Sequence, residues 1–233
     1  MTNRTQRETM LRALAPDLWV AEQAQRFYGF EMGTRMTVVR LGSGGLFVHS
    51  PVRLEAELQR QLDALGSVCV VVAPNRYHHL YVGDYVDAYP GAQILAAPGL
   101  AEKRRDLKFH AVLGNRAPEL WAGQIDQIVF PLAMVNEAVF YHRASRTLLV
   151  SDLVFNMQHT DSWGTWLLFR ADGAYGKLAF SRVFRLLTRD KAAAREVAEK
   201  ILTWDFERVI LAHGDIVERD GRAELQQALA RAL

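Results

Sequence analysis

The chain has 233 residues, of which half are hydrophobic and 23% are charged, a composition typical of a globular protein with a substantial core. Its 28 basic and 26 acidic side chains nearly cancel, which gives no argument for binding to nucleic acid or to an anionic membrane surface. The single cysteine, Cys69, excludes an intrachain disulfide and predicts a buried thiol in a cytoplasmic protein. No apolar run suits a signal peptide or approaches the roughly 18 residues of a membrane span, so neither is expected.

The first third of the chain alternates between β-rich runs and helical periodicity. Two β-rich runs flank "GSGG", which predicts a hairpin within residues 36–49. Leucines then recur every three or four positions, which predicts an amphipathic helix over 53–65 that ends at Gly66. The following run, "SVCVVVAP", is apolar on both faces, so residues 67–73 should form a strand buried on both sides.

The same alternation continues to the C-terminus. In chain order we expect a short helix before Pro90, a strand at 93–97, a short helix after Gly99, a strand at 126–131, two strands about a turn within 137–151, a helix at 190–204, a strand at 207–212 and a helix at 220–232. Hairpins in both halves favour two mixed sheets covered by helices, an α+β fold, over a doubly wound parallel sheet. We see no linker, so residues 1–233 are interpreted as one domain, with 1–15 as a peripheral N-terminal extension.

Residues 157–189 are rich in aromatic side chains and follow no clear pattern. Their aromatic content is too high for a free linker. Two roles fit this segment. It roofs a crevice and supplies an apolar substrate wall, or it forms the surface of a homodimer.

Ligand-capable side chains follow three apolar strands. His78 and His79 come after "VVVAPNRY", Asp152 after "TLLVS", and His213 after "RVILA". Side chains just beyond strand ends sit on a rigid scaffold and face a crevice, and histidine and aspartate are suitable ligands for zinc, iron or manganese. Each residue alone also fits a simpler role: the histidine pair as solvated loop residues, Asp152 as a helix cap and His213 as a strand terminus. Their occurrence at three strand ends favours a metal site.

The order of these elements resembles the metallo-β-lactamase fold, an αββα sandwich. More closely, the sequence resembles an uncharacterised bacterial family of metallo-β-lactamase-like proteins whose function is unknown. The matching stretches are "RMTVVRL", "GGLFVHSPV", "APNRYHHLY", "VFYHRASRTLLVSDLVFN" and "WDFERVILAHGD".

The superfamily's His-x-His-x-Asp-His motif is altered in this chain. With His79 on its last histidine, His78 takes the place of the aspartate, while Arg76 and Pro74 replace the first two histidines. No histidine occurs in "FPLAMVNE", where the first metal site's third histidine would be expected, so the resemblance implies that the first site is lost. The second site's positions hold His78, His79, Asp152 and His213, a set able to bind one divalent ion and a water. We therefore expect at most one metal per chain, zinc or iron, or none.

Three further residues are candidates for the surroundings of that site. Arg76 can supply positive charge in place of the lost ligands and bind an anionic substrate group, or point into solvent. His49 and Asp215 are candidates to orient the ligands, with a structural histidine and a solvated turn residue as the simpler interpretations.

These observations leave three functions open. The first is a single-metal hydrolase of a small ester, lactone or phosphoester, in which the metal activates water. The second is a metal-free binding or interaction module on the same scaffold, and the third a single-iron oxidoreductase. We expect a small-molecule substrate, with an anionic one favoured by Arg76, and neither nucleic acid nor membrane as a partner.

Overall fold

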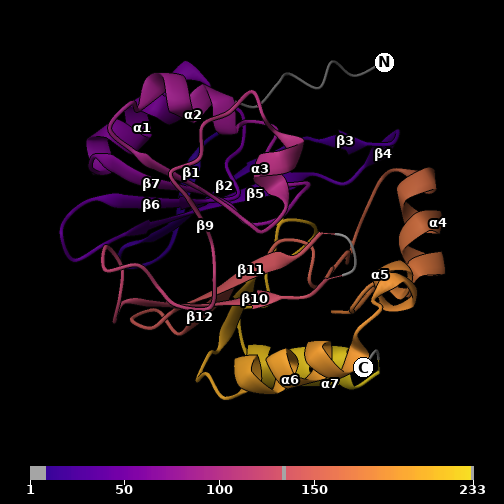
Figure 1. Cartoon of the computed structure of the whole chain (residues 1–233). Helices are drawn as coiled ribbons and strands as arrows, with labels where there is room; N and C mark the ends of the chain where they lie inside the picture. Colours follow the sequence, from indigo (N-terminus) through magenta and orange to yellow (C-terminus); the bar gives the residue numbers. More distant parts are fainter. Residues whose placement is uncertain (1–8, 133–134, 232–233) are drawn as a thin grey trace, which may run out of the picture.

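The computed structural model describes residues 9–132 and 135–231. Two β-sheets pack face to face at the centre, and helices cover their outer faces, so the layers follow the order helix, sheet, sheet, helix (Figure 1). The predicted α+β architecture of two mixed sheets is therefore confirmed.

The larger sheet has seven strands in the order β1-β2-β5-β6-β7-β8-β9. Its strands are β1 (Leu11–Ala15), β2 (Leu18–Gln23), β5 (Thr34–Arg40), β6 (Leu46–His49), β7 (Val68–Ala73), β8 (Gln93–Ala96) and β9 (Ala111–Val112). Strands β1 to β6 pair antiparallel, whereas β6 to β9 pair in parallel. The predicted hairpin is β5–β6. The apolar run after it is β7, which lies between two strands as expected for a residue run buried on both faces.

The smaller sheet has four strands in the order β10-β11-β12-β13. Its strands are β10 (Ile125–Phe130), β11 (Glu137–His142), β12 (Thr147–Leu149) and β13 (Arg208–Ile210). Strands β10, β11 and β12 are antiparallel, and β13 is parallel to β12. A separate hairpin, β3 (Arg26–Phe27) with β4 (Phe30–Glu31), leaves the larger sheet between β2 and β5.

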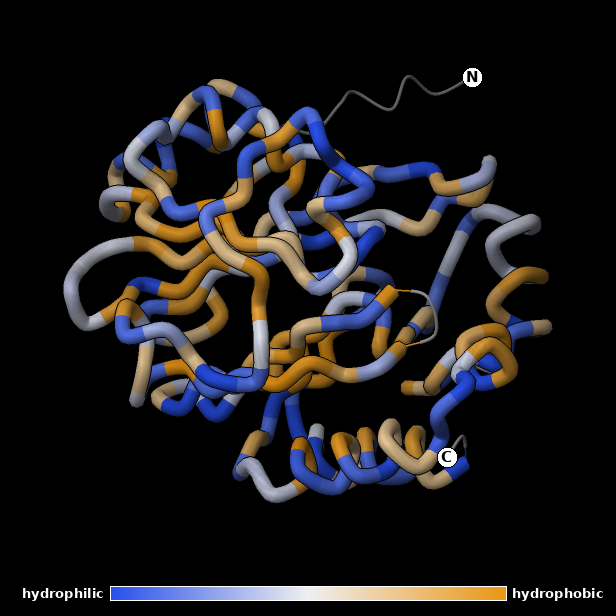
Figure 2. Tube along the Cα trace, viewed as in Figure 1, coloured by the Kyte–Doolittle hydropathy of each residue, from blue (hydrophilic) through white to orange (hydrophobic). Residues whose placement is uncertain are grey.

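Three apolar layers hold these elements together. Helices α1 (Ala56–Leu65), α2 (Val82–Ala88) and α3 (Leu100–Lys103) cover the outer face of the larger sheet, and α6 (Lys191–Leu202) and α7 (Gly221–Ala230) cover the smaller one. In α1 the predicted periodicity places Leu58 and Leu62 inward with no exposed surface, a burial that contributes about 1.5–3 kcal/mol for each side chain. Hydrophobic residues accordingly concentrate in the strands and on the inner faces of the helices (Figure 2). None of the helices described is both long and apolar enough to cross a membrane.

Two of the regions that the sequence left without elements differ in their place in the fold. Residues 11–15, assigned to a peripheral extension, form the edge strand β1, while residues 1–8 of that extension lie outside the described part of the chain. The aromatic-rich segment contains α4 (Trp163–Asp172) and α5 (Arg182–Leu187), which lie together at one side of the molecule (Figure 1). Each helix begins at a serine whose hydroxyl accepts a hydrogen bond from the helix backbone, Ser162 from Thr165 and Ser181 from Phe184.

Candidate metal centre

Four chain segments that follow strands meet at one edge of the two sheets. Ser50 follows β6 and residues 75–79 follow β7 in the larger sheet, whereas Asp152 follows β12 and His213 follows β13 in the smaller sheet. Within each sheet the two strands concerned are parallel, so their carboxyl ends share an edge. This topology brings together His78, Asp152 and His213, which are separated from one another by more than 50 residues in the sequence.

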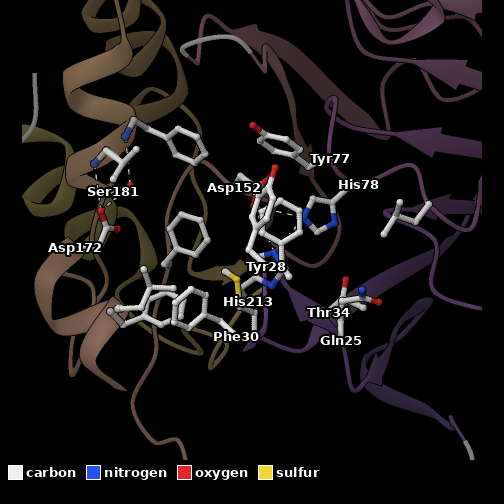
Figure 3. A pocket seen from close by; sticks show the side chains of 18 of the residues that line it. Gln25, Tyr28, Phe30, Thr34, Tyr77, His78, Asp152, Asp172, Ser181 and His213 are labelled. Carbon is white, nitrogen blue, oxygen red and sulfur yellow. Dashed lines mark hydrogen bonds and ion pairs between the residues drawn. The ribbon is translucent and has the colours of Figure 1, made fainter. Parts of the chain in front are cut away.

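Three of the predicted ligands converge in a triangle. The Nε2 atom of His78 lies 3.2 Å from Nε2 of His213, and each of these atoms lies 3.4 Å from Oδ1 of Asp152. Figure 3 shows the three side chains turned toward one another at the wall of a cavity. All three are largely withdrawn from solvent.

The other ring nitrogen of each histidine fixes its orientation. Nδ1 of His213 lies 2.7 Å from the carbonyl oxygen of Gly33, which accepts hydrogen bonds only, so Nδ1 carries the proton. Nδ1 of His78 lies 2.9 Å from the Ser50 hydroxyl, which can accept in the same way. With one proton on each ring, at Nδ1, both Nε2 atoms would present a lone pair to the carboxylate of Asp152. Three acceptors therefore face one another, which is an arrangement that requires a cation or a proton between them.

A buried amide and a buried carboxylate hold Asp152 and the histidine loop. Asn75 donates from Nδ2 to Asp152 at 2.8 Å and to Glu137 at 3.1 Å, while its Oδ1 accepts from the backbone N–H groups of Tyr77 and His78. Glu137 accepts from the backbone N–H groups of Ser151 and Asp152, each at 2.7 Å. Neither Asn75 nor Glu137 has any exposed surface. The loop that carries His78 and the segment that carries Asp152 are thus tied to each other beneath the triangle.

The two buried carboxyl groups have opposite pKa shifts. Burial and the charge of nearby Asp152 raise the pKa of Glu137, against the effect of its three N–H donors. Burial also acts to raise the pKa of Asp152, but the positive charge and the hydrogen bonds that His78 and His213 provide when a proton lies between the rings and the carboxylate outweigh it and hold that pKa well below its usual range. Asp152 is therefore the anionic member of the pair and the one that faces the histidines.

Glu137 was not among the residues that the sequence singled out, although it contacts both Asp152 and Asn75. The hairpin register would have located it. Phe140 pairs with Leu149, and three further steps along both strands bring Glu137 opposite Asp152. Asn75 was missed for a different reason, because its role depends on a loop geometry that no periodicity encodes.

His79 does not join the triangle. Among the described residues, the histidine and acidic side chains able to share one ion are His78, Asp152 and His213. Nδ1 of His79 lies 2.9 Å from Nη1 of Arg104, and a guanidinium can only donate, so the imidazole proton of the neutral ring is on Nε2. Burial, together with the charges of Lys103 and Arg104, lowers the pKa of His79 to about 4 and keeps the ring neutral. The expectation that His79 converges with His213 and Asp152 is corrected in this respect.

Arg76 lies away from the cavity. Its side chain runs beside Gly99, where an added Cβ would lie 3.5 Å from Arg76 Cδ, and its backbone carbonyl accepts a hydrogen bond from Lys103. It is absent from the described residues that line the cavity. The structure thus does not support the predicted contact between Arg76 and an anionic substrate group. The chain packs this guanidinium against the loop before α3 instead.

The contacts of His49 and Asp215 match the simpler of the two interpretations considered for each, a structural histidine and a turn residue. His49 is fully buried between the sheets, edge-on to Phe140, and the next residue, Ser50, makes the hydrogen bond that orients His78. Ser50 adopts a left-handed backbone conformation with φ of 55°, which is unusual for serine and directs its hydroxyl toward His78. Asp215 accepts from the backbone N–H of Gln158 and serves a turn.

Arg35 positions the His213 loop from the opposite sheet. Its guanidinium donates to the carbonyl oxygens of Leu211 and, at 2.7 Å, Gly214, which flank His213. Gly214 has φ of 89°, and a Cβ at this position would overlap the carbonyl oxygen of Asn156, so glycine is required there. The glycine in "AHGD" therefore serves backbone geometry, and Arg35, which sequence reasoning did not single out, spans the two sheets.

A cavity of about 370 Å³ opens onto the triangle. The β3–β4 hairpin, the histidine loop, α4 and α5 form its walls, and the described lining is predominantly aromatic and aliphatic (Figure 3). The segment 157–189 thus supplies an apolar wall, one of the two roles considered for it. Whether it also forms a dimer surface stays a prediction.

The donor geometry fits a tetrahedral metal ion. Zinc bonds of 2.0–2.1 Å place ligand atoms about 3.3–3.4 Å apart in a tetrahedron. The three edges of the triangle are 3.2, 3.4 and 3.4 Å. Two imidazoles and one carboxylate would leave the fourth position for water or substrate.

Comparison with known proteins places the chain in a family and identifies its fold. A family model described as a domain of unknown function, DUF4336, matches residues 16–162, while no curated protein matches the chain. Among solved structures, the DIM-1 metallo-β-lactamase exposed to ceftazidime has a TM-score of 0.66 and 13% identity, over 97% of this chain and 99% of that one. A metallo-β-lactamase from Pontibacter korlensis has a TM-score of 0.65 and 14% identity, over 96% and 98%. The FIM-1 metallo-β-lactamase from Pseudomonas aeruginosa, in its mono-zinc form, has a TM-score of 0.65 and 10% identity, over 96% of both chains. At such low identity these likenesses show the fold alone, and they confirm the predicted metallo-β-lactamase-like architecture. Since the family model covers more than half of its length, the chain belongs to the DUF4336 family and has the metallo-β-lactamase fold.

Proposed function

We propose that this protein is a single-metal hydrolase of a small-molecule ester, lactone or phosphoester. The observation that carries the proposal is the triangle of His78 Nε2, His213 Nε2 and Asp152 Oδ1, whose edges suit one tetrahedral ion. When bound, a divalent metal supplies a water of lowered pKa and polarises the oxygen of the scissile group.

The chain's own residues prepare this chemistry in three ways. The Gly33 carbonyl oxygen fixes the tautomer of His213, and the Ser50 hydroxyl can accept from Nδ1 of His78, so that the Nε2 lone pairs can face the ion position without rearrangement. Asn75 and Glu137 hold Asp152 and leave its Oδ1 directed at the histidines. The aromatic and aliphatic walls place apolar surface beside the ion position, and a less polar surrounding strengthens electrostatic interactions at the reacting group.

A single metal is proposed because the places of two further histidine ligands hold Pro74 and Arg76. Proline offers no side-chain donor, and a guanidinium cannot ligate. The backbone oxygen of Pro74 already accepts a hydrogen bond from Ala138.

A single-iron oxidoreductase is the second candidate. Two histidines and one carboxylate, the set observed once His79 is excluded, also form the ligand set of many non-haem iron sites. The metal-free binding module is the third, and it predicts no metal at all.

Elemental analysis separates these candidates. Protein purified without added metal should contain about one equivalent of zinc and hydrolyse 4-nitrophenyl esters, and dialysis against a chelator should abolish both until zinc is restored. One equivalent of iron with no esterase activity would support the oxidoreductase instead. Two tightly bound equivalents, or no uptake from excess zinc, would refute the single-metal site.

A further inference from the structure

We propose that the cavity selects uncharged substrates that carry a hydrophobic group, such as an ester or lactone with a medium-length acyl chain. The inference rests on the proposed function, because the reacting group would sit at the His78–Asp152–His213 triangle. It deepens that function by naming the substrate class, and it favours neutral esters over phosphoesters and other anions.

Apolar side chains converge on the cavity from separate segments. Phe27 and Phe30 come from the β3–β4 hairpin, Leu168 from α4, and Phe184 and Leu187 from α5. Hairpin and helix also contact each other, since the hydroxyl of Thr165 accepts from the Glu31 N–H and donates to its carbonyl oxygen. The wall is therefore one assembled surface, and burying an apolar group against it is favourable by about 25 cal/mol per Å².

The charges around the cavity oppose an anionic ligand. No lysine or arginine occurs among the described residues of the lining. The acidic residues of the described lining are Asp152, in the triangle, and Asp172, at the far end of the cavity (Figure 3). A substrate carboxylate or phosphate away from the metal would thus lose its hydration without gaining a cationic partner, which is unfavourable.

Several polar groups of the cavity lining are paired with one another. Asp172 accepts from the Ser181 hydroxyl at 2.9 Å and from the Val183 N–H at 3.1 Å. The Tyr81 hydroxyl donates to Gln25 at 2.7 Å. These bonds leave the hydrocarbon surface as the main contact for a ligand. The cavity volume of about 370 Å³ suits a small molecule and not a polymer.

The first test uses binding to metal-free protein, so that it does not depend on hydrolysis. A neutral fluorescent probe, N-phenyl-1-naphthylamine, should bind, and 1-decanol should displace it at a concentration at least tenfold lower than decanoate does at pH 8. Equal displacement by the alcohol and the carboxylate, or no probe binding, would overturn the inference.

Adjacent leucines on the two helices provide matched variants. Leu168 on α4 and Leu187 on α5 line the cavity, whereas their neighbours Leu167 and Leu186 do not, and are 47% and 82% exposed. Leu168→Asp and Leu187→Asp should each weaken probe binding at least tenfold, while Leu167→Asp and Leu186→Asp should stay within twofold. Leu187 is 48% exposed, so the α5 pair decides the question if Leu168→Asp does not fold. Equal effects within both pairs would place the binding site elsewhere.

The second test uses the zinc-loaded protein and 4-nitrophenyl esters from acetate to decanoate. The kcat/KM should rise about fourfold for each added methylene until the cavity is filled. A flat or falling series would overturn the substrate class while leaving the hydrolase standing. Conversely, normal probe binding without hydrolysis of any ester would refute the hydrolase and leave the apolar ligand class intact.

Discussion

The metal triangle and the apolar wall lie against the same cavity but are built differently. The triangle consists of buried polar side chains at strand ends, and it is held by backbone carbonyls, backbone N–H groups and two further buried side chains. The wall comes from a two-stranded hairpin and two short helices, and several of its apolar side chains are partly exposed. Substitutions at the triangle should therefore have large effects, because one displaced atom breaks the hydrogen-bond network. Substitutions at the wall should have smaller effects. Metal binding and substrate preference should accordingly be separable by mutation.

The largest separation is expected between His213→Ala and Leu168→Asp. His213→Ala removes one of three donors, so metal content should fall from about one equivalent to less than about 0.1, and esterase activity should drop at least 10³-fold. Leu168→Asp should keep the metal and lose preference for long acyl chains. Elemental analysis and the ester series measure the two effects. Full metal retention in His213→Ala would mean that the ion binds elsewhere.

Two glycines with positive φ test whether the backbone beside the triangle tolerates substitution less well than the backbone near the wall. Gly214, beside His213, has φ of 89° and its Cβ position overlaps Asn156, whereas Gly176, between α4 and α5, has φ of 74° and nothing within 4 Å. Gly214→Ala should lower the free energy of unfolding by about 3 kcal/mol and reduce metal content, because both strain and collision arise. Gly176→Ala should lower it by only about 1 kcal/mol. Urea unfolding measures both, and equal losses would show that the loop after His213 is not specially constrained.

Two arginines extend the comparison to side chains. Arg35→Met leaves the carbonyl oxygens of Leu211 and Gly214 without their donor, which should reduce stability by about 1–3 kcal/mol and zinc affinity by about tenfold. Arg26 pairs with Glu31 in the β3–β4 hairpin but is 72% exposed. Arg26→Met should therefore change stability by less than about 1 kcal/mol and leave zinc affinity unchanged. Zinc competition titrations would detect the difference. An unaltered zinc affinity in Arg35→Met would remove its positioning role.

Most of the fold was predictable because its strands and helices carry local signals. Strand β7 is apolar on both faces, and α1 repeats leucine with helical spacing. In both elements the local pattern and the tertiary packing favour the same secondary structure. The wall carries no such signal. Helix α5 spans only Arg182–Leu187 and has no fully buried residue. It is stabilised by the Ser181 cap and by the packing of Phe184 against the adjacent core. Short elements of this kind depend on tertiary contacts that a single sequence does not reveal.

The candidate site was predictable at the level of strand ends and not at the level of rotamers. His78, Asp152 and His213 follow strands that topology brings together, so their convergence followed from the architecture. His78 and His79 are adjacent in sequence, and no pattern tells which ring faces inward. The two rings differ because Nδ1 of His79 is hydrogen-bonded to Arg104, whereas Nδ1 of His78 is hydrogen-bonded to Ser50. The side chain of Arg76 likewise lies beside Gly99, a position that alignment with a motif cannot show.

The smallest expected effect concerns His49, a buried imidazole of the inter-sheet layer close to the triangle. Burial and the nearby His78 lower its pKa to about 3, against about 6.5 in the unfolded chain. The unfolded state therefore binds a proton below about pH 6.5 that the folded state rejects. Its contribution to stability is thus fully present above the unfolded pKa and is lost as pH falls from 6.5 toward 3.

Between pH 7 and pH 5.5 this one histidine should lower the free energy of unfolding by about 1 kcal/mol. His49→Leu removes the titrating ring, keeps an apolar side chain beside Phe140, and should flatten the pH dependence by that amount. His159 is exposed, so His159→Leu is the matched substitution outside the buried layer. Urea unfolding of metal-free protein at several pH values gives the comparison, and metal must be absent so that loss of ligand binding does not add to the slope. If the free energy of unfolding of His49→Leu depends on pH between 7 and 5.5 as strongly as that of the wild type, protons taken up by other groups control acid stability. The layer between the sheets would then tolerate a charged imidazole better than the burial of His49 indicates.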